Sequence, residues 1–381
     1  MVRRLDSERM QTSEADGLDA GGPGDGTAGS GPRPPLSMLE RTKEEMEQWC
    51  ISSGFPGFHG PQILRWLHER LVTSFGEMTD LPTALRKRLE AEGIIFTGNV
   101  VREERAGDST RKLLIRYADG QSVECVLIPE ATRITACIST QVGCAVRCVF
   151  CASGLEGVKR NLTAGEIVEQ VLHLKRKLGP KEKITNLVFM GMGEPLHNVS
   201  NLLRSIEILR APWGANLGAR RITVSTSGPP GRIPLLTEAG VPVHLAVSLH
   251  APYDDLRRKL IPGKTSPVAD LIAESKDFFR KTGRRVTFEV ALIDGLNCER
   301  DHARSLGKRL KGFPCLVNLI PMNPVEGIAL RPPSTSAVLA YRKELESHGV
   351  EVAIRMRKGD KIAAACGQLR MRTDVAREGG G

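Results

Sequence analysis

Apolar and polar positions in the second half of the chain follow two alternating patterns, one typical of strands and one of helices. Short apolar runs occupy residues 133–139, 184–190, 221–226, 243–249, 285–292 and 315–320. Amphipathic segments such as 163–178 and 201–209 lie between them. Six successive strand–helix units predict an α/β fold with a parallel sheet wound in one direction. We expect a last helix near 335–348 and a last strand near 350–356.

The pattern nearer the N-terminus predicts a small helical unit. Ser37 and Glu40 have the spacing of a capping box, so we expect a helix that continues through residues 44–45. Pro61 is suited to open a second helix, in which Trp66 is predicted to be a core residue. The apolar residues at helical spacing are Ile63, Leu64, Leu67 and Leu71 in this helix, and Leu81, Leu85 and Leu89 in a third that stops near Gly93.

Turn-forming residues divide the rest of the chain. Two apolar runs between Leu113 and Ile128 flank Ala118-Asp119-Gly120, which predicts a β-hairpin. Residues 17–31 contain seven Gly and almost no apolar side chain, so this stretch cannot offset its ordering entropy by burial. The predicted parts are a disordered tail (1–36), a helical domain (37–95), a β-hairpin extension (96–130), an α/β domain (131–372) and a flexible tail (373–381).

Composition and charge narrow the function classes. Hydrophobic residues make up 40% and charged residues 26%, as in soluble globular proteins. No apolar run approaches the ~20 residues that cross a bilayer, and the first residues lack the apolar core of a signal peptide, so we expect a cytoplasmic protein without membrane contact. The net charge of +10 favours a polyanionic partner such as nucleic acid. Nine cysteines, three of them within 144–151, indicate metal binding or catalysis more than disulfides.

The strongest chemical signal is the C-x3-C-x2-C loop formed by Cys144, Cys148 and Cys151. A capping-box pair, Thr163 and Glu166, starts the next helix, so the three cysteines lie in a loop after the first strand. Thiolates suit zinc or an iron–sulfur cluster. Three ligands leave the fourth iron of a cubane cluster open to the amino and carboxylate groups of a small molecule. A structural zinc site usually has a fourth ligand at short spacing, and neither side offers one.

Several further motifs occur in a fixed order around this loop. They are Ala136-Cys137-Ile138-Ser139-Thr140-Gln141-Val142-Gly143-Cys144, Lys159-Arg160-Asn161-Leu162-Thr163, Met190-Gly191-Met192-Gly193-Glu194-Pro195, Ser225-Thr226-Ser227-Gly228, Ser248-Leu249-His250-Ala251-Pro252, Asn318-Leu319-Ile320-Pro321 and Ala364-Ala365-Cys366-Gly367-Gln368-Leu369. With the cysteine loop, they resemble the RlmN/Cfr family of radical S-adenosylmethionine (SAM) RNA adenosine methyltransferases over residues 37–372. The resemblance implies a partial (β/α)6 TIM-like barrel, and it makes residues 37–95 an accessory RNA-binding domain.

The resemblance also implies the cofactors and their ligands. A 4Fe–4S cluster held by Cys144, Cys148 and Cys151 cleaves SAM to a 5′-deoxyadenosyl radical, and two SAM molecules are used per turnover. A glycine turn and a carboxylate after the second strand suit close approach to a ligand, and ligands of parallel sheets gather at the C-terminal ends of strands. The matching SAM-binding positions are Gly193, Glu194, Ser225, Ser248, Leu249, His250 and Asn323.

Two separate cysteines have implied catalytic roles. Cys366 accepts a methyl group from one SAM, for which a thiolate is a suitable nucleophile. The radical from a second SAM activates this methyl, which adds to an adenine carbon and gives a protein–RNA adduct. Cys137 then releases the methylated RNA, leaving a Cys137–Cys366 disulfide that a thiol reductant must reduce. Glu124 matches the family's proton acceptor, although by pattern alone it is a solvent-facing strand residue. An electron donor such as flavodoxin or ferredoxin is also implied.

The substrate implied by the resemblance is RNA. RlmN enzymes methylate C2 of adenosine 2503 in 23S rRNA and of adenosine 37 in tRNA, whereas Cfr enzymes methylate C8 of the same rRNA base. Gly-Glu-Pro at 193–195 and Ser-Thr-Ser-Gly at 225–228 favour RlmN. A target base must leave its stack, so a pocket for a flipped adenine is required. Basic residues proposed to face RNA are Lys159, Arg160, Arg220, Arg221, Arg355, Arg357 and Lys358.

The sequence departs from the family pattern at two places, and it leaves two other function classes open. Lys361-Ile362-Ala363 replaces the usual Asp-Ile-Asp, and Pro262-Gly263-Lys264 replaces Pro-Ile-Asn. These changes allow a shifted RNA target. One alternative is an RNA-binding protein that keeps only a structural metal, and another is a radical SAM enzyme acting on a small molecule or protein.

Overall fold

The computed structural model describes residues 36–325, 327–355, 362–364 and 367–369 of the 381-residue chain. Residues 35–381 form one compact unit, separate from residues 1–34. Cys366, Lys361, Arg357 and Lys358, the predicted tail 373–381 and nearly all of the predicted tail 1–36 lie outside the described residues.

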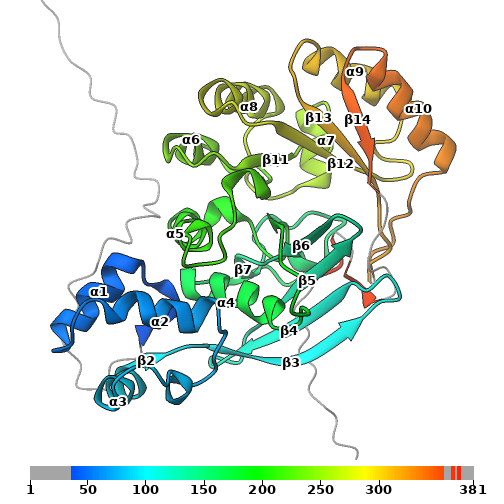
Figure 1. The fold of residues 1–381 in the computed structure, drawn as a ribbon. Coiled ribbons are helices and arrows are strands. Elements are labelled where there is room, and N and C mark those ends of the chain that lie inside the picture. The colour runs from blue at the N-terminus through cyan, green and yellow to red at the C-terminus, as the bar shows by residue number, and fades with distance from the viewer. Residues whose placement is uncertain (1–35, 326, 356–361, 365–366, 370–381) are drawn as a thin grey trace, which may run out of the picture. The chain divides into compact units, whose positions relative to one another are not determined.

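One ten-stranded sheet organises the described part of the chain (Figure 1), in the order β14-β13-β12-β11-β10-β9-β6-β5-β4-β3. Strands β6 and β9–β14 run parallel to one another. The pairs β3–β4, β4–β5 and β5–β6 are antiparallel. The strands are β3 Gly98–Arg105, β4 Arg111–Tyr117, β5 Ser122–Glu130, β6 Arg133–Cys137, β9 Asn186–Phe189, β10 Ile222–Thr226, β11 His244–Ser248, β12 Val286–Leu292, β13 Leu316–Pro321 and β14 Glu351–Ile354. All six predicted strand positions and the predicted final strand are confirmed.

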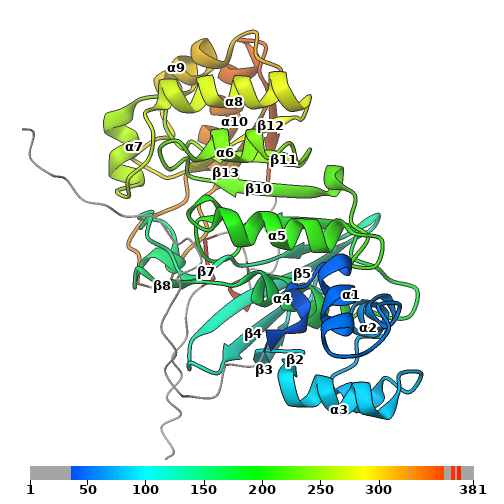
Figure 2. The same ribbon diagram turned by 90° about the vertical axis from the view of Figure 1, so that its left-hand side faces the viewer.

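Helices connect the parallel strands and cover the outer face of the sheet (Figure 2). They are α4 Ala164–Lys175, α5 Val199–Arg210, α6 Arg232–Glu238, α7 Asp254–Leu260, α8 Val268–Thr282, α9 Arg300–Leu310 and α10 Thr335–Glu346. The fold is therefore the predicted α/β partial barrel. Among the described residues, no helix has both the length and the apolar character that crossing a bilayer requires.

The N-terminal helices are α1 Lys43–Ser52, α2 His59–His68 and α3 Thr83–Glu92, which ends at Gly93 as predicted. The predicted capping box at Ser37 and Glu40 is wrong, because Ser37 makes no side-chain cap. Thr42 and Glu45 form the capping box instead and start α1. Glu40 accepts a hydrogen bond from Gly165 N at the start of α4, 3.2 Å away, so it joins the helical part to the barrel.

The predicted hairpin is confirmed as β4 and β5, which turn at Asp119 and Gly120. A third antiparallel strand, β3, was not predicted, because its register with β4 shifts between Val100 and Arg102 and the bulge breaks the alternation of apolar and polar residues. A short pair, β7 Gln141–Gly143 with β8 Val158–Asn161, forms the base of the cysteine loop. Another, β1 Leu36–Ser37 with β2 Gly93–Ile94, closes the helical part.

A buried histidine joins the helical part to the barrel and makes stability sensitive to acid. His68 on α2 is fully buried, its ring meets Trp213 edge-on, and neither ring nitrogen has a hydrogen-bond partner in the described part of the chain. Burial, with the nearby charge of Lys175, lowers the pKa of His68 to about 3. The unfolded chain therefore binds more protons than the folded one between about pH 3 and pH 6.5, and stability falls as the pH falls through that window.

We expect His68→Leu to remove this pH dependence. Between pH 7.5 and pH 5, this histidine should lower the free energy of unfolding of the parent by about 2 kcal/mol. The variant should lack this fall, because a leucine takes up no proton. Urea titrations at the two pH values measure this difference. A full pH dependence in the variant would contradict the assignment.

Candidate active site

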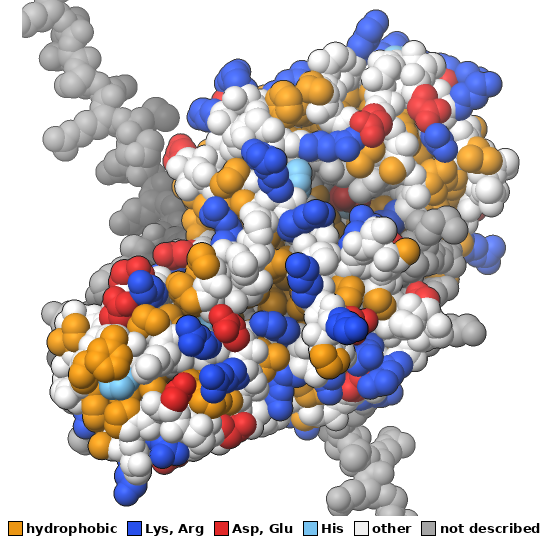
Figure 3. Space-filling view, viewed as in Figure 1, with side chains coloured by type: hydrophobic (Ala, Val, Ile, Leu, Met, Phe, Trp, Pro, Cys, Tyr) orange, Lys and Arg blue, Asp and Glu red, His pale blue; other side chains and the backbone are white. Residues whose placement is uncertain are grey.

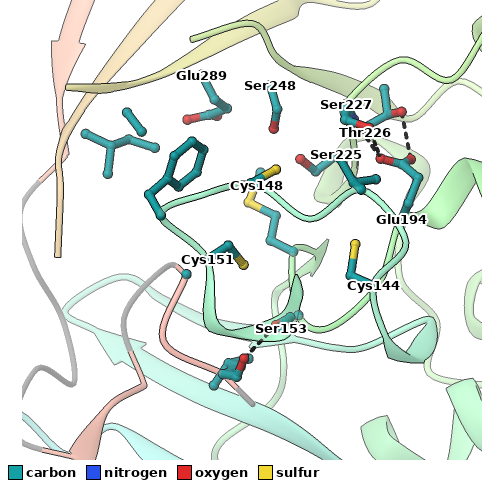
Figure 4. A pocket seen from close by; sticks show the side chains of 18 of the residues that line it. Cys144, Cys148, Cys151, Ser153, Glu194, Ser225, Thr226, Ser227, Ser248 and Glu289 are labelled. Carbon is teal, nitrogen blue, oxygen red and sulfur yellow. Dashed lines mark hydrogen bonds between the residues drawn. The ribbon is translucent and has the colours of Figure 1, made fainter. Parts of the chain in front are cut away.

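A single cavity opens at the C-terminal ends of the parallel strands and contains most of the predicted site residues (Figure 4). The cysteine loop forms one side of it, and Ser225, Ser248 and Glu289 lie across from that loop. The predicted residues that line the cavity are Cys144, Cys148, Cys151, Gly193, Glu194, Ser225, Ser248, His250 and Asn323. Residues up to 179 positions apart in the chain, from Cys144 to Asn323, meet here because parallel strands deliver their ends to one edge of the sheet.

The backbone fixes the cysteine loop at both ends. Gly143 has a φ of 75°, and a β-carbon there would lie 1.9 Å from the carbonyl oxygen of Gly157, so only glycine allows β7 to approach the far end of the loop. The amide of Cys144 donates to the same Gly157 carbonyl at 3.0 Å. Burial raises the pKa of Cys144 to about 12 and raises the pKa of Cys148 and Cys151, so a bound cation is needed to hold these thiols as thiolates.

The three thiols suit a multi-metal cluster better than a single ion. Their sulfur atoms are spread around one end of the cavity (Figure 4), and among the described residues no three His, Cys, Asp or Glu side chains converge on one point. Ligands of a single zinc ion must all lie ~2.0–2.3 Å from it. In a cubane cluster each cysteine binds a different iron, so spread sulfur atoms fit it.

Glu194 joins two of the strand ends. Its Oε1 accepts hydrogen bonds from Thr226 Oγ1 at 2.7 Å and Leu196 N at 3.0 Å. Its Oε2 accepts from Ser227 N at 2.7 Å and Ser227 Oγ at 2.8 Å. The carboxylate is 3% exposed, and these four bonds occupy the usual acceptor positions of its two oxygens. Glu194 therefore shapes the cavity by tying the loop after β9 to the end of β10.

Gly193, the residue before Glu194, allows the Glu194 carboxylate to reach these partners. Gly193 has a φ of 101°, and a β-carbon there would lie 2.6 Å from the β-carbon of Gln141. Gln141 accepts from Glu194 N at 2.8 Å and donates to Asn161 at 2.7 Å, so it joins the Gly193–Glu194 turn to β8. The turn can stay open to a ligand on its cavity side.

His250 is held in a strained position that turns one ring nitrogen to the cavity. Its φ is 60°, a conformation costly for a residue with a β-carbon. Asn297 donates to His250 O at 2.8 Å and to Ala291 O at 2.6 Å, which holds the turn. Nδ1 of His250 accepts from Ala291 N at 2.9 Å, so Nε2 carries the proton as a donor. Burial lowers the pKa of His250 to about 3, so the ring is neutral.

The side chain of Leu249 lies outside the cavity, unlike those of its neighbours Ser248 and His250. Its side chain is fully buried in the main core and does not line the cavity. Its amide donates to Glu289 O at 3.1 Å, and its carbonyl accepts from Arg257 Nε at 3.2 Å. Any contact of Leu249 with a ligand must therefore be made by its backbone.

Glu124 and Cys137 lie on β5 and β6 and do not line this cavity. The pattern-based prediction of a solvent-facing Glu124 is wrong, since the residue is 2% exposed. Lys112 on β4, equally buried, lies 2.9 Å from Glu124 Oε1 and 3.5 Å from the carbonyl of Ala363. Cys137 is buried.

The described residues that follow Cys366 contact the end of the cysteine loop. Ala152 N donates to Gly367 O at 2.8 Å, and Ser153 Oγ donates to Leu369 O at 2.6 Å. Gly367 and Leu369 also line the cavity. The residues that immediately follow Cys366 are thus part of the wall that carries the cysteine loop.

Comparison with known proteins agrees with this geometry. The radical SAM superfamily model matches residues 138–305, and the model of the ribosomal RNA large subunit methyltransferase N-terminal domain matches residues 36–95. A probable dual-specificity RNA methyltransferase RlmN from Rhodopirellula baltica is 46% identical over 87% of this chain and 90% of its own. The chain belongs to the RlmN family. The dual-specificity RNA methyltransferase RlmN of Syntrophobacter fumaroxidans is 42% identical over 88% of this chain and 98% of its own.

A solved structure shares the fold as well as the sequence. The crystal structure of a radical SAM methyltransferase from Sphaerobacter thermophilus matches with a TM-score of 0.85 and 42% identity, covering 88% of this chain and 99% of that one. As a radical SAM protein of the RlmN family, the chain uses a 4Fe–4S cluster and SAM. The cavity described above is the candidate site for both groups.

Sequence motifs did not reveal the residues that support the RlmN site. Arg257, Asn297, Gln141, Lys112 and Glu289 are all buried polar residues that bind loops or other site residues. Only Glu289 has a visible signal in the sequence, because it is a single carboxylate within an apolar strand.

Proposed function

We propose that this protein is a radical SAM methyltransferase that adds a methyl group to C2 of an adenosine in 23S rRNA and in tRNA. The observation that carries the proposal is the union of the cysteine loop with the segment after Cys366 in one cavity wall, in a chain that aligns over most of its length with RlmN relatives. A purely structural metal site gives no reason for the residues after a distant cysteine to bind this loop.

We assign the metal and SAM contacts as follows. Cys144, Cys148 and Cys151 hold the cluster, which when bound and reduced supplies the electron that cleaves SAM. Gly193, Ser225, Ser248, His250 and Asn323 line the space beside it and contact SAM, His250 with its Nε2–H. Leu249 contributes its backbone, and Glu194 holds the turn that carries the contacts.

The chain's own residues carry the methyl group. Cys366 attacks the methyl of one SAM as a thiolate and becomes a thioether. The 5′-deoxyadenosyl radical would remove one hydrogen atom from this methyl, so that the remaining CH2 carbon can bond to adenine C2. The adduct then loses one electron, which the oxidised cluster would accept, and Glu124 takes the proton that C2 loses. The thiolate of Cys137 attacks the Cys366 sulfur, the bond from that sulfur to the CH2 carbon breaks toward the RNA, this carbon takes up a proton to become the methyl group, and a Cys137–Cys366 disulfide remains. A thiol reductant resets the disulfide.

Basic side chains around the cavity support an RNA substrate. Lys and Arg side chains surround a hollow in the middle of one face (Figure 3). Arg355 lines the cavity, and Lys159 is exposed. Arg220 and Arg221, predicted to lie near the barrel mouth, are exposed but precede β10, at the opposite edge of the parallel sheet from the cavity. Arg160 is a poor RNA contact, because its guanidinium binds Glu166 at 2.7 Å and Asp119 at 2.5 Å. We further propose that residues 37–95 bind RNA, that flavodoxin or ferredoxin donates the electron, and that the enzyme works in the cytoplasm.

The test is product analysis with the reconstituted enzyme. After anaerobic loading with iron and sulfide, the protein is incubated with reductant, labelled SAM and protein-free 23S rRNA fragments or tRNA. We expect 2-methyladenosine by nucleoside mass spectrometry. We also expect Cys137→Ala to trap a covalent protein–RNA adduct and Cys366→Ala to give no product, because each blocks a different step.

A matched control is Cys315→Ala, which removes a buried thiol from the start of β13 outside the cavity and should keep the activity. A label in 8-methyladenosine would instead assign Cfr-like chemistry. Tight RNA binding without SAM cleavage would indicate an RNA-binding protein, and SAM cleavage without RNA methylation would overturn the RNA assignment alone.

A further inference from the structure

Glu289 is a buried carboxylate with one oxygen left without a partner. It lies on β12, in register with Ser248 on β11 and Asn318 on β13, and is 5% exposed. Its Oε1 accepts from Asn318 Nδ2 at 3.0 Å. Its Oε2 has no hydrogen-bond partner in the described part of the chain and is shielded from solvent. Burying such an acceptor costs free energy unless a partner is supplied.

The unpaired oxygen belongs to the wall between two cavities. Glu289 lines the active-site cavity, where it lies beside Ser248 (Figure 4), and also a second cavity inside the barrel. Ser225, Ser248 and His250 line only the first cavity. Ala364, two residues before Cys366, lines only the second. Glu289 thus lies where the two cavities adjoin.

We propose that Glu289 Oε2 accepts a hydrogen bond from the exocyclic amino group of an adenine bound in this cavity. The inference rests on the proposed function, in which SAM and the target nucleotide are both adenosines. The amino group is the one N–H donor on the adenine ring, and a carboxylate oxygen is an acceptor that matches it. Asn318 holds the other oxygen, so the carboxylate is oriented before a ligand arrives.

One observation favours the adenine of RNA over that of SAM. Of the residues assigned to SAM, only Asn323 also lines the second cavity, which Glu289 shares with Ala364, two residues before Cys366. Burial raises the pKa of Glu289, and the charge of Arg355, which lines both cavities, opposes that rise.

The test variant is Glu289→Gln in the full-length, reconstituted enzyme. Asn318 should hold the amide oxygen, which leaves the amide NH2 at the position of Oε2, where it opposes another N–H donor. Glu289→Ala repeats the test without an introduced donor. The matched control is Glu169→Gln, since Glu169 is also fully buried with one unpartnered oxygen but lies on α4 outside both cavities.

Two measurements distinguish the sources of the adenine. The first is SAM affinity and reductive SAM cleavage without RNA. The second is the KM for RNA and the number of methyl groups transferred per SAM cleaved. For Glu289→Gln we expect the KM for RNA to rise about tenfold or more with SAM affinity within twofold of the parent. Replacing the target adenosine by purine riboside, which lacks the amino group, should weaken the parent and not weaken the variant further.

A fall in SAM affinity with unchanged RNA parameters would support the hydrogen bond and assign it to SAM. The inference is overturned if both Glu289 variants match the Glu169→Gln control in both measurements. Failure of the proposed function is separate, because it appears as absence of 2-methyladenosine in the parent, and the SAM measurement still tests Glu289 in that case.

Discussion

Lys112→Met should reduce RNA methylation at pH 7 about 100-fold and move the activity to higher pH. Lys112 is buried with Glu124, and its Nζ lies 2.9 Å from Glu124 Oε1 and 3.4 Å from Glu104 Oε2. A proton acceptor must be ionised before the reaction, and the neighbouring ammonium favours the ionised form. Without that charge, ionising Glu124 requires a higher pH, so the rate should rise over a pH range where the parent is already constant.

The rate–pH profile of methylation measures this shift. Removing one partner from a buried ion pair also costs about 3–5 kcal/mol of stability. The double variant Lys112→Met with Glu124→Gln removes both charges, so it should recover most of that stability while staying inactive. Lys177→Met is the matched control. Lys177 pairs with Glu103 of β3 at 2.8 Å, but the lysine side chain is partly exposed. A parent-like pH profile in folded Lys112→Met would show that Lys112 does not act through Glu124.

Arg257→Lys should lower both the stability of the protein and its affinity for SAM. The Arg257 guanidinium is 2% exposed and donates to carbonyls in three segments around the cavity. Its partners are Leu249 O at 3.2 Å, Ser248 O at 3.2 Å, Ser227 O at 2.5 Å, Ser266 O at 3.2 Å and Thr265 Oγ1. A lysine has three donors on one nitrogen and cannot reach all five acceptors.

We expect the free energy of unfolding to fall by about 3 kcal/mol and the dissociation constant for SAM to rise at least tenfold, because Ser248 and the Leu249 backbone lose their support. Urea titration and equilibrium dialysis measure the two effects. The control is Arg258→Lys at the next position, where the guanidinium is mostly exposed and binds Asp255. If both lysine variants behave alike, Arg257 does not organise the site.

The parallel strands were predictable because they form short, largely apolar runs bounded by turn residues, as in residues 286–292. The cysteine loop and the glycine turn at 193 were predictable because their chemistry is local in sequence. Arg257 was not, since its sequence, Arg257-Arg258-Lys259, is typical of a solvated helix, and only tertiary packing separates the buried arginine from its exposed neighbours.

Contacts between segments that are far apart in the chain could also not be predicted from the sequence. Glu124 was expected to face solvent because strand alternation alone does not show that β4 supplies a buried lysine beside it. The family resemblance implies that Glu124 is a proton acceptor, but the buried cation that accompanies it could be found only from the antiparallel register of β4 and β5. Strand β3 escaped prediction because of its bulge.

The contact between Ser153 and Leu369 spans 216 positions in the sequence, and it has a consequence for the newly made chain. A nascent polypeptide that has left the ribosome only as far as α10 already contains all three cysteines of the loop but lacks the residues that bond to Ala152 and Ser153. Forming contacts between such distant segments comes late, since closing a long loop costs entropy before the contact repays it. Iron delivered during synthesis would therefore meet an open cysteine loop, whereas iron delivered after chain release would meet a partly closed one. The order of these segments along the chain thus determines which form of the loop the iron meets at each stage.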